Sequence, residues 1–210
     1  MKKIGFLVNP IAGMGGRVGL KGTDGEGILE KAISLGAVQE APEKAKKALS
    51  KVVELKDKFT IYTASGLMGE IECKELGLNY EVVYNAKENS SVSDSRELLK
   101  YFLENGIELI FFVGGDGTAR DVYSVVEDKI PVIGVPAGVK IHSPVYGNTP
   151  EQAGSLLYEV INGVELPVIE KDVVDIDEEA FRDDRVEVRL YGYLKVPFDQ
   201  RYLQNKKSQT

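Results

Sequence analysis

Three glycines surround a single carboxylate in the segment Gly114–Thr118, which directly follows the apolar run Leu109–Val113. Glycines after a strand allow positive φ angles and the close approach of a ligand to the backbone. A helix that begins at Thr118 would point its positive end toward an anion. In phosphoryl transfer, a carboxylate placed there can accept the proton of the attacking hydroxyl group. The segment therefore predicts a phosphate-binding turn, with Asp116 as the catalytic base and its carboxyl group facing a cleft.

A second interpretation gives Asp116 a structural role only. Aspartate often accepts a hydrogen bond from the backbone at the start of a helix or within a tight turn. In that case Asp116 caps the helix that follows and takes no part in chemistry. Both interpretations are compatible with the sequence, and the position of the carboxyl group distinguishes them.

A glycine-rich segment follows the apolar run Ile4–Val8, and seven of the fifteen residues from Gly13 to Gly27 are glycine. The segment contains neither the P-loop pattern nor G-x-G-x-x-G. Long glycine-rich loops at strand ends are usually binding loops, and Asp24 adds a group that can contact a hydroxyl. We therefore expect this loop to contact a ligand, with a plain surface loop as the alternative.

A third loop, Pro136–Tyr146, holds the only histidine of the chain, His142, between Lys140 and Ser143. It follows the apolar run Pro131–Val135, so it also belongs to a strand end. We expect Lys140, His142 and Ser143, together with Asp24, to be candidate substrate contacts. The alternative for His142 is a structural histidine with its hydrogen bonds satisfied.

The elements that position these loops alternate between strand and helix. Short apolar runs predict five buried parallel strands, namely Ile4–Val8, Phe59–Thr63, Tyr80–Tyr84, Leu109–Val113 and Pro131–Val135. Periodic segments and end signals predict helices at Ile28–Leu35, Pro42–Lys56, Leu67–Leu76, Ser93–Asn105, Thr118–Val126 and Pro150–Ile161, the last capped by Thr149. The pattern predicts an α/β fold, an open, mostly parallel sheet flanked by helices.

The last part of the chain has a different pattern. Val168–Ile176 and Arg185–Val196 alternate in character with no helix between them, which predicts a paired β element. We therefore expect residues 1–165 to form one α/β domain that contains the Gly114–Thr118 motif, and the resemblance described below implies that this domain binds a nucleotide. Residues 166–210 are expected to form a β extension with a polar tail, as the start of a truncated second lobe.

Composition limits the function classes. The chain has 210 residues, 43% of them hydrophobic, and a formal net charge of −7. An acidic chain without a basic block is a poor partner for nucleic acid, although local dipoles can still bind a phosphorylated small molecule. No apolar run reaches the roughly 18 residues of a membrane span. The acidic run Glu170–Asp184 lacks the spacing of an EF-hand, and we expect a solvated face there.

The chain has one cysteine, Cys73, and one histidine, His142. These counts exclude an internal disulfide framework and a multi-histidine metal site, and we predict no metal ligands from the protein. A reducing, cytoplasmic setting fits best. A homo-oligomer is also expected, because a bare sheet edge in the second half would need cover.

Three segments in this order resemble a known superfamily. Gly114–Thr118 is similar to the glycine-aspartate signature shared by NAD kinases, diacylglycerol and sphingosine kinases, and phosphofructokinases. Asn9–Gly13 is similar to the first motif of the lipid and NAD kinases. Val8–Gly25 together with Gly134–Ser143 most resembles the predicted ATP-NAD kinase family, which includes the acetoin-operon protein AcoX. The resemblance extends over most of the chain and implies the fold of an NAD kinase N-terminal domain.

The resemblance implies phosphoryl transfer from ATP, or from polyphosphate, to the 2′-hydroxyl of NAD with Mg²⁺, which gives NADP. Asp116 matches the catalytic aspartate of the family. The residues that match its phosphate-facing turn are Gly114, Gly115, Gly117 and Thr118. Those that match its first nucleotide loop are Asn9, Gly13, Gly15 and Gly16. The implied partners are small-molecule nucleotides.

The chain also departs from the NAD kinases. They continue into a β-rich lobe with an Asn-Glu pair that holds NAD, and no Asn-Glu dipeptide followed by such a lobe occurs here. Two other functions therefore stay open. One is a kinase of another small alcohol or of a lipid. The other is a non-catalytic, regulatory nucleotide-binding protein of the AcoX-like branch.

Overall fold

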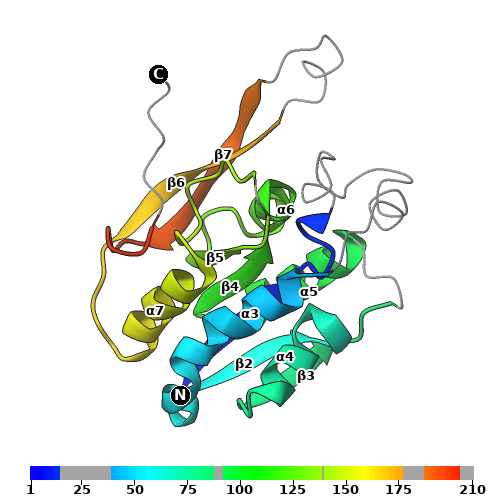
Figure 1. The fold of residues 1–210 in the computed structure, drawn as a ribbon, viewed down its shortest axis with the longest axis vertical. Coiled ribbons are helices and arrows are strands. Elements are labelled where there is room, and N and C mark those ends of the chain that lie inside the picture. Colours follow the sequence, from blue (N-terminus) through cyan, green and yellow to red (C-terminus); the bar gives the residue numbers. More distant parts are fainter. Residues whose placement is uncertain (15–38, 88–91, 139, 177–186, 204–210) are drawn as a thin grey trace.

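A five-stranded parallel sheet forms the centre of the molecule (Figure 1). The computed structural model describes residues 1–14, 39–87, 92–138, 140–176 and 187–203. In spatial order the strands are β3 (Tyr80–Tyr84), β2 (Phe59–Ala64), β1 (Lys2–Val8), β4 (Leu109–Gly114) and β5 (Val132–Pro136). All four neighbouring pairs are parallel. The predicted α/β sheet is confirmed, and each of its strands begins and ends within two residues of the prediction.

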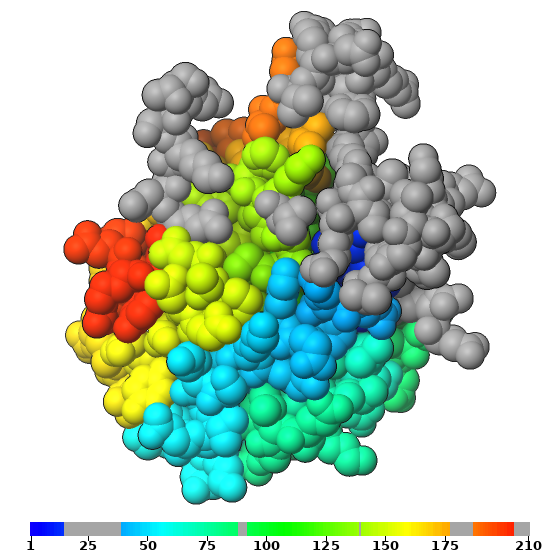
Figure 2. Space-filling view, in the orientation of Figure 1, coloured from blue at the N-terminus to red at the C-terminus, as the bar shows by residue number. Residues whose placement is uncertain are grey.

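Helices cover both faces of the sheet, which is why its central strands are apolar on both sides. Every residue of β4 is buried, and the rings of Phe6 on β1 and Phe111 on β4 stack with their centroids 6.2 Å apart. One layer contains α3 (Ala41–Leu49), the 3₁₀ helix η1 (Ser50–Lys58), α4 (Glu70–Glu75) and α7 (Pro150–Ile161). The other layer contains α5 (Val92–Glu104) and α6 (Asp116–Val126). Figure 2 views the molecule from the side on which α3 and α7 lie together.

Within the described residues, the helix predictions are confirmed in place but not in every boundary. The expected helix over Pro42–Lys56 changes to 3₁₀ geometry at Ser50. The expected helix over Leu67–Leu76 is interrupted at Gly69, whose φ of 152° separates the short η2 (Gly66–Met68) from α4. Thr149 caps α7 as predicted, because its hydroxyl accepts a hydrogen bond from the Gln152 N–H at 3.1 Å. The helix predicted over Ile28–Leu35 lies outside the described residues.

The predicted paired β element is an antiparallel hairpin of β6 (Val168–Ile176) and β7 (Val188–Pro197). It forms its own two-stranded sheet, and in Figure 1 it extends beyond the α/β body. The hairpin packs on α6, and the contact is close at Gly192, where a Cβ atom would lie only 2.1 Å from the ring of Tyr123. None of the helices in the described parts of the chain is long and apolar enough to span a bilayer.

Candidate active site

The strand order creates a switch point between β1 and β4. After β1 the chain continues to β2 and β3 on one side, and it then returns to β4 on the other side of β1. Val8 at the end of β1 is in register with Val113 near the end of β4. Ligands of open α/β sheets bind beyond the carboxyl ends of the strands at such a point. The two predicted motifs follow these strands, so the topology brings both of them to this position.

A direct contact joins the two motifs. The side-chain amide of Asn9 donates a hydrogen bond to the hydroxyl of Thr118 at 3.2 Å, and its carbonyl oxygen accepts one from the Ile11 N–H at 3.3 Å. The backbone N–H of Asn9 also donates to the carbonyl of Val113 at 3.0 Å. Asn9 therefore fixes the start of the first loop against the start of α6.

Three of the predicted glycines have different surroundings. Gly13 has a φ of 82°, and a Cβ atom there would lie 2.3 Å from the carbonyl oxygen of Ala137. Gly114 leaves room for Thr118, whose hydroxyl would be 2.2 Å from a Cβ atom at position 114. A Cβ atom on Gly115 would meet nothing within 4 Å, so space is available beside the turn. The first two glycines serve packing, and Gly115 borders open space.

Asp116 is the first residue of α6, two residues before the predicted start of the helix. Its carboxylate accepts hydrogen bonds from the backbone N–H groups of His142, at 2.9 Å to Oδ2 and 3.2 Å to Oδ1, and of Ser143, at 2.9 Å to Oδ1. The N-cap is Gly115, and no side chain caps the helix. The capping interpretation is therefore wrong. The residue is only 7% exposed, so the carboxyl group is also less open than we expected.

The environment of Asp116 changes its acidity. Burial raises the pKa of this carboxyl group above its ordinary value, because the charged form loses hydration. The two N–H groups of the 142–143 backbone oppose this shift, and the nearby negative charge of Asp175 adds to it. The result is a carboxylate that binds a proton more readily than an exposed aspartate does.

Ser143 is fully buried and fastens the third loop to the hairpin. Its hydroxyl donates to the carbonyl of Val174 at 2.7 Å and accepts from the Val174 N–H at 3.0 Å. The side chains of Lys140 and His142 are exposed, and His142 reaches Asp116 through its backbone N–H. Of the predicted site residues, Gly15, Gly16 and Asp24 lie outside the described residues.

Tyr146 contacts the candidate site and is absent from the site residues that the sequence analysis names. It is fully buried, and its hydroxyl donates to the carbonyl of Gly115, the residue before Asp116. Its ring meets that of Phe112 edge-on, with the centroids 5.4 Å apart. The tyrosine lies outside the three motifs, and its only signal was its place in the loop after the fifth strand.

Arg120 is a second residue that the sequence analysis missed. Its guanidinium contacts the Asp175 carboxylate of β6 at 3.2 Å and lies over the Tyr191 ring of β7, with Cζ 3.8 Å from the ring centroid. Asp175 is therefore an exception to the solvated face that we expected for the acidic run. The available signal was spacing, because Arg120 follows Asp116 by four residues on one helix.

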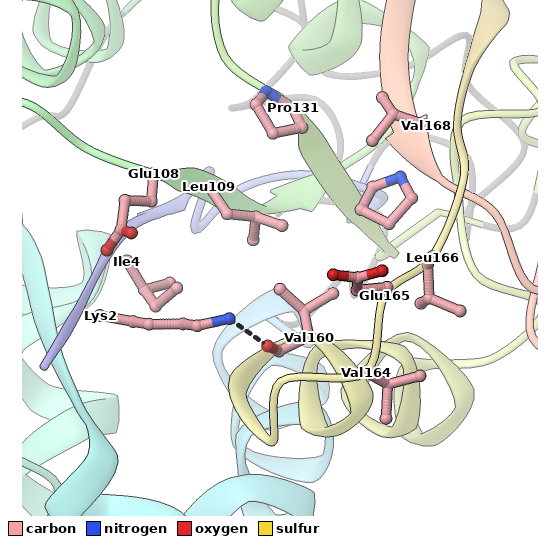
Figure 3. A pocket seen from close by; sticks show the side chains of 11 residues that line it. Lys2, Ile4, Glu108, Leu109, Pro131, Val160, Val164, Glu165, Leu166 and Val168 are labelled. Carbon is pink, nitrogen blue, oxygen red and sulfur yellow. Dashed lines mark hydrogen bonds between the residues drawn. The ribbon is translucent and has the colours of Figure 1, made fainter.

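A separate hollow of about 500 Å³ lies at the opposite edge of the sheet (Figure 3). Lys2, Leu109 and Pro131, from the amino ends of β1 and β4 and just before β5, line it together with residues after α7. The ammonium group of Lys2 donates to the carbonyl of Val160 there. This hollow is distinct from the predicted site, because β4 runs from Leu109 toward Asp116.

Most of the chain matches a known protein family. Residues 4–164 match the family model of the ATP-NAD kinase N-terminal domain. Two similar solved structures, both assigned as diacylglycerol kinases of Bacillus anthracis str. Sterne, show 16% and 19% identity with TM-scores of 0.41 and 0.39. In each case 84% of this chain is covered but only 43% of the other, so this chain spans less than half of their length. No curated protein matches the chain.

Proposed function

The chain belongs to the ATP-NAD kinase family, and we propose that it transfers a phosphoryl group from ATP, or from polyphosphate, to the 2′-hydroxyl of NAD. The observation that carries this proposal is the position of Asp116 just after the carboxyl end of β4. The pKa of its carboxyl group is raised, so the carboxylate accepts a proton more readily than an exposed aspartate does. The contact between Asn9 and Thr118 supports it by joining the two motifs beside that carboxylate.

In the proposed reaction the Asp116 carboxylate accepts the hydroxyl proton of NAD. The hydroxyl oxygen then forms a bond to the terminal phosphorus, and the bond between that phosphorus and the leaving oxygen of ADP breaks. Oδ2 accepts a hydrogen bond from one backbone N–H, so it retains capacity for a hydroxyl donor. The first N–H groups of α6 have no partner within the helix and can bind phosphate oxygens, with Gly115 leaving space for them.

Magnesium would reach this site with the nucleotide. No three side chains of His, Cys, Asp or Glu gather into a metal-binding group within the described ranges. Mg²⁺ commonly keeps several waters and binds to substrate phosphates with one or two carboxylates, and it neutralises phosphate charge during transfer. A site with the Asp116 carboxylate therefore fits a Mg²⁺ ion that is held mainly by the phosphates of ATP.

One observation favours a second function, that of a non-catalytic nucleotide-binding protein. Asp116 is nearly buried and holds the 142–143 backbone through its carboxylate. A residue whose sole task is to fasten this loop would be found in the same place. Nucleotide binding without turnover, in a regulatory protein like AcoX, would then be the activity.

The decisive experiment measures NADP formation from NAD, ATP and Mg²⁺ by the wild-type chain and by Asp116→Asn. We expect the substitution to lower kcat by roughly 10²–10⁴, the usual contribution of a general base, while the affinity for ATP stays within a few-fold. A matched control is Asp199→Asn, because Asp199 pairs with Arg201 in an exposed turn after β7. It should leave kcat unchanged.

The outcomes separate the candidate functions. Equal turnover by wild type and Asp116→Asn would refute the role of Asp116 as base. ATP binding by calorimetry without any NADP would favour the non-catalytic function. Phosphorylation of diacylglycerol or another alcohol in place of NAD would identify a different acceptor. The same assays with polyphosphate in place of ATP test the second phosphate donor. The AcoX-like branch, the homo-oligomer and the cytoplasmic location stay predictions.

A further inference from the structure

The guanidinium of Arg120 is held from two sides. It pairs with the Asp175 carboxylate at 3.2 Å, and its Cζ lies 3.8 Å from the centre of the Tyr191 ring. A planar cation fixed by a carboxylate and an aromatic face loses little conformational freedom when it binds a further partner. The side chain of Arg120 is nevertheless 37% exposed. It is therefore oriented and also accessible to a ligand.

This cation lies next to the predicted catalytic carboxylate. Arg120 follows Asp116 by four residues in α6, a spacing that brings side chains to the same helix face with Cβ atoms about 5–6 Å apart. Ser143 links the same two elements, because it contacts both Asp116 of α6 and Val174 of β6, the residue before Asp175. The first two turns of α6, the third loop and β6 thus meet around Asp116.

A second cation, Arg189, lies near the same aromatic ring. Arg189 of β7 is the cross-strand partner of Asp175, and its Cζ lies 5.2 Å from the centre of the Tyr191 ring. Two guanidinium groups therefore lie near the Tyr191 ring, and that of Arg120 also contacts the Asp175 carboxylate. In a chain with a net charge of −7, two cations therefore lie around one ring of the hairpin that packs on α6.

A cation here would favour phosphoryl transfer, because negative charge spreads over the non-bridging phosphate oxygens in the transition state. A guanidinium has five N–H donors in a planar fork, and one hydrogen bond, from Nη1, goes to Asp175. We propose that Arg120 binds the phosphate chain of the nucleotide donor, with Arg189 as a second cation at the same site. This inference rests on the proposed function, since it names the group that would hold the donor beside Asp116.

The alternative is that Arg120 only joins α6 to the hairpin through its ion pair with Asp175. Two variants distinguish this structural role from phosphate binding. Arg120→Gln and Asp175→Asn each remove the ion pair, and both should lower the unfolding temperature to a similar extent. Binding of Mg²⁺-ATP and of inorganic triphosphate is then measured by calorimetry. Arg120→Gln should weaken both ligands at least tenfold, whereas Asp175→Asn should keep the Kd within about threefold or lower it, because it removes a competing anion.

The chain offers a matched control at the other end of the hairpin. Arg201 pairs with Asp199 at 2.6 Å and has its Cζ 4.8 Å from the Tyr202 ring, which repeats the same three residue types away from Asp116. Arg201→Gln should leave the affinity for ATP unchanged. The inference would be overturned if Arg120→Gln and Asp175→Asn weakened ATP binding equally, or if Arg120→Gln did not weaken it at all. In either case, ATP binding by the wild-type chain would still support the proposed function. A wild-type chain that binds no ATP would instead refute the proposed function.

Discussion

Ser143 connects the Asp116 carboxylate to the hairpin. Its N–H donates to Asp116 at 2.9 Å, and its hydroxyl exchanges two hydrogen bonds with the backbone of Val174. The third loop is thereby held from both sides, by the start of α6 and by β6 of the hairpin. The orientation of the carboxyl group and the position of β6 consequently depend on one another.

The first prediction concerns this connection. Ser143→Ala removes the partner of the Val174 N–H and carbonyl, and leaving them unpaired should cost about 1–3 kcal/mol of unfolding free energy. It should also lower kcat roughly 10- to 100-fold with little change in KM, because the loop no longer orients Asp116. Denaturant unfolding and steady-state kinetics check the two effects. Ser155→Ala, whose hydroxyl bonds within α7, is the control and should change kcat by less than about twofold.

The second prediction concerns pH. A base must be deprotonated, so kcat should fall as the pH falls through the pKa of Asp116, which burial raises above that of an ordinary aspartate. Asp175→Asn removes a negative charge that contributes to this shift, so the acid limb of the profile should move to lower pH. The pH dependence of kcat in the two proteins tests this. A limb that stays in place, or moves to higher pH, would show that another group titrates.

The third prediction uses a pair of glycines with the same backbone angle. Gly13 and Gly163 both have a φ of 82°, but a Cβ atom would meet the Ala137 carbonyl at 2.3 Å at Gly13 and nothing within 4 Å at Gly163. Gly163→Ala should cost only the backbone strain, about 1 kcal/mol. Gly13→Ala should cost at least about 2 kcal/mol more and weaken ATP binding, because the loop beside Asn9 must shift. Thermal unfolding and calorimetry of both variants compare the two positions.

The fourth prediction concerns Glu72 of α4, which is 1% exposed and has no hydrogen-bond partner for its carboxyl oxygens among the described residues. Burial raises its pKa to about 8, with Glu75 and Glu43 adding to the shift and Lys46 opposing it. The folded chain therefore holds a proton that the unfolded chain has lost above a pH of roughly 4.5. Stability from this group is complete below that pH and is lost as the pH rises to about 8.

Unfolding free energies of the wild type and Glu72→Gln, measured between pH 4 and 9, test this assignment. The variant should lose most of this decline, on the order of 2–4 kcal/mol across the range, because glutamine carries no proton to lose. If the two curves stay parallel over the whole range, Glu72 is not the group responsible.

The sequence specified the sheet well because its strands are nearly uniform apolar runs, as in β4, and buried parallel strands require that composition. Helix boundaries were less predictable. The sequence predicts that the helix begins at Thr118, after the three glycines, whereas α6 begins at Asp116, whose carboxylate accepts hydrogen bonds from the backbone of the third loop. Long-range partners left no local pattern. Neither the hydrogen bond from Tyr146 to the Gly115 carbonyl nor the ion pair between Arg120 and Asp175 of β6 can be inferred before the fold is known.

The contact between Asn9 and Thr118 has a consequence for folding. These residues are 109 positions apart, so their hydrogen bond forms only after β1 and β4 have paired and closed a long loop, at an entropic cost of about 4 kcal/mol. The proposed nucleotide site therefore depends on the pairing of the two central strands of the sheet. A ligand bound there should therefore slow hydrogen exchange throughout β1 and β4, far beyond the residues that it touches.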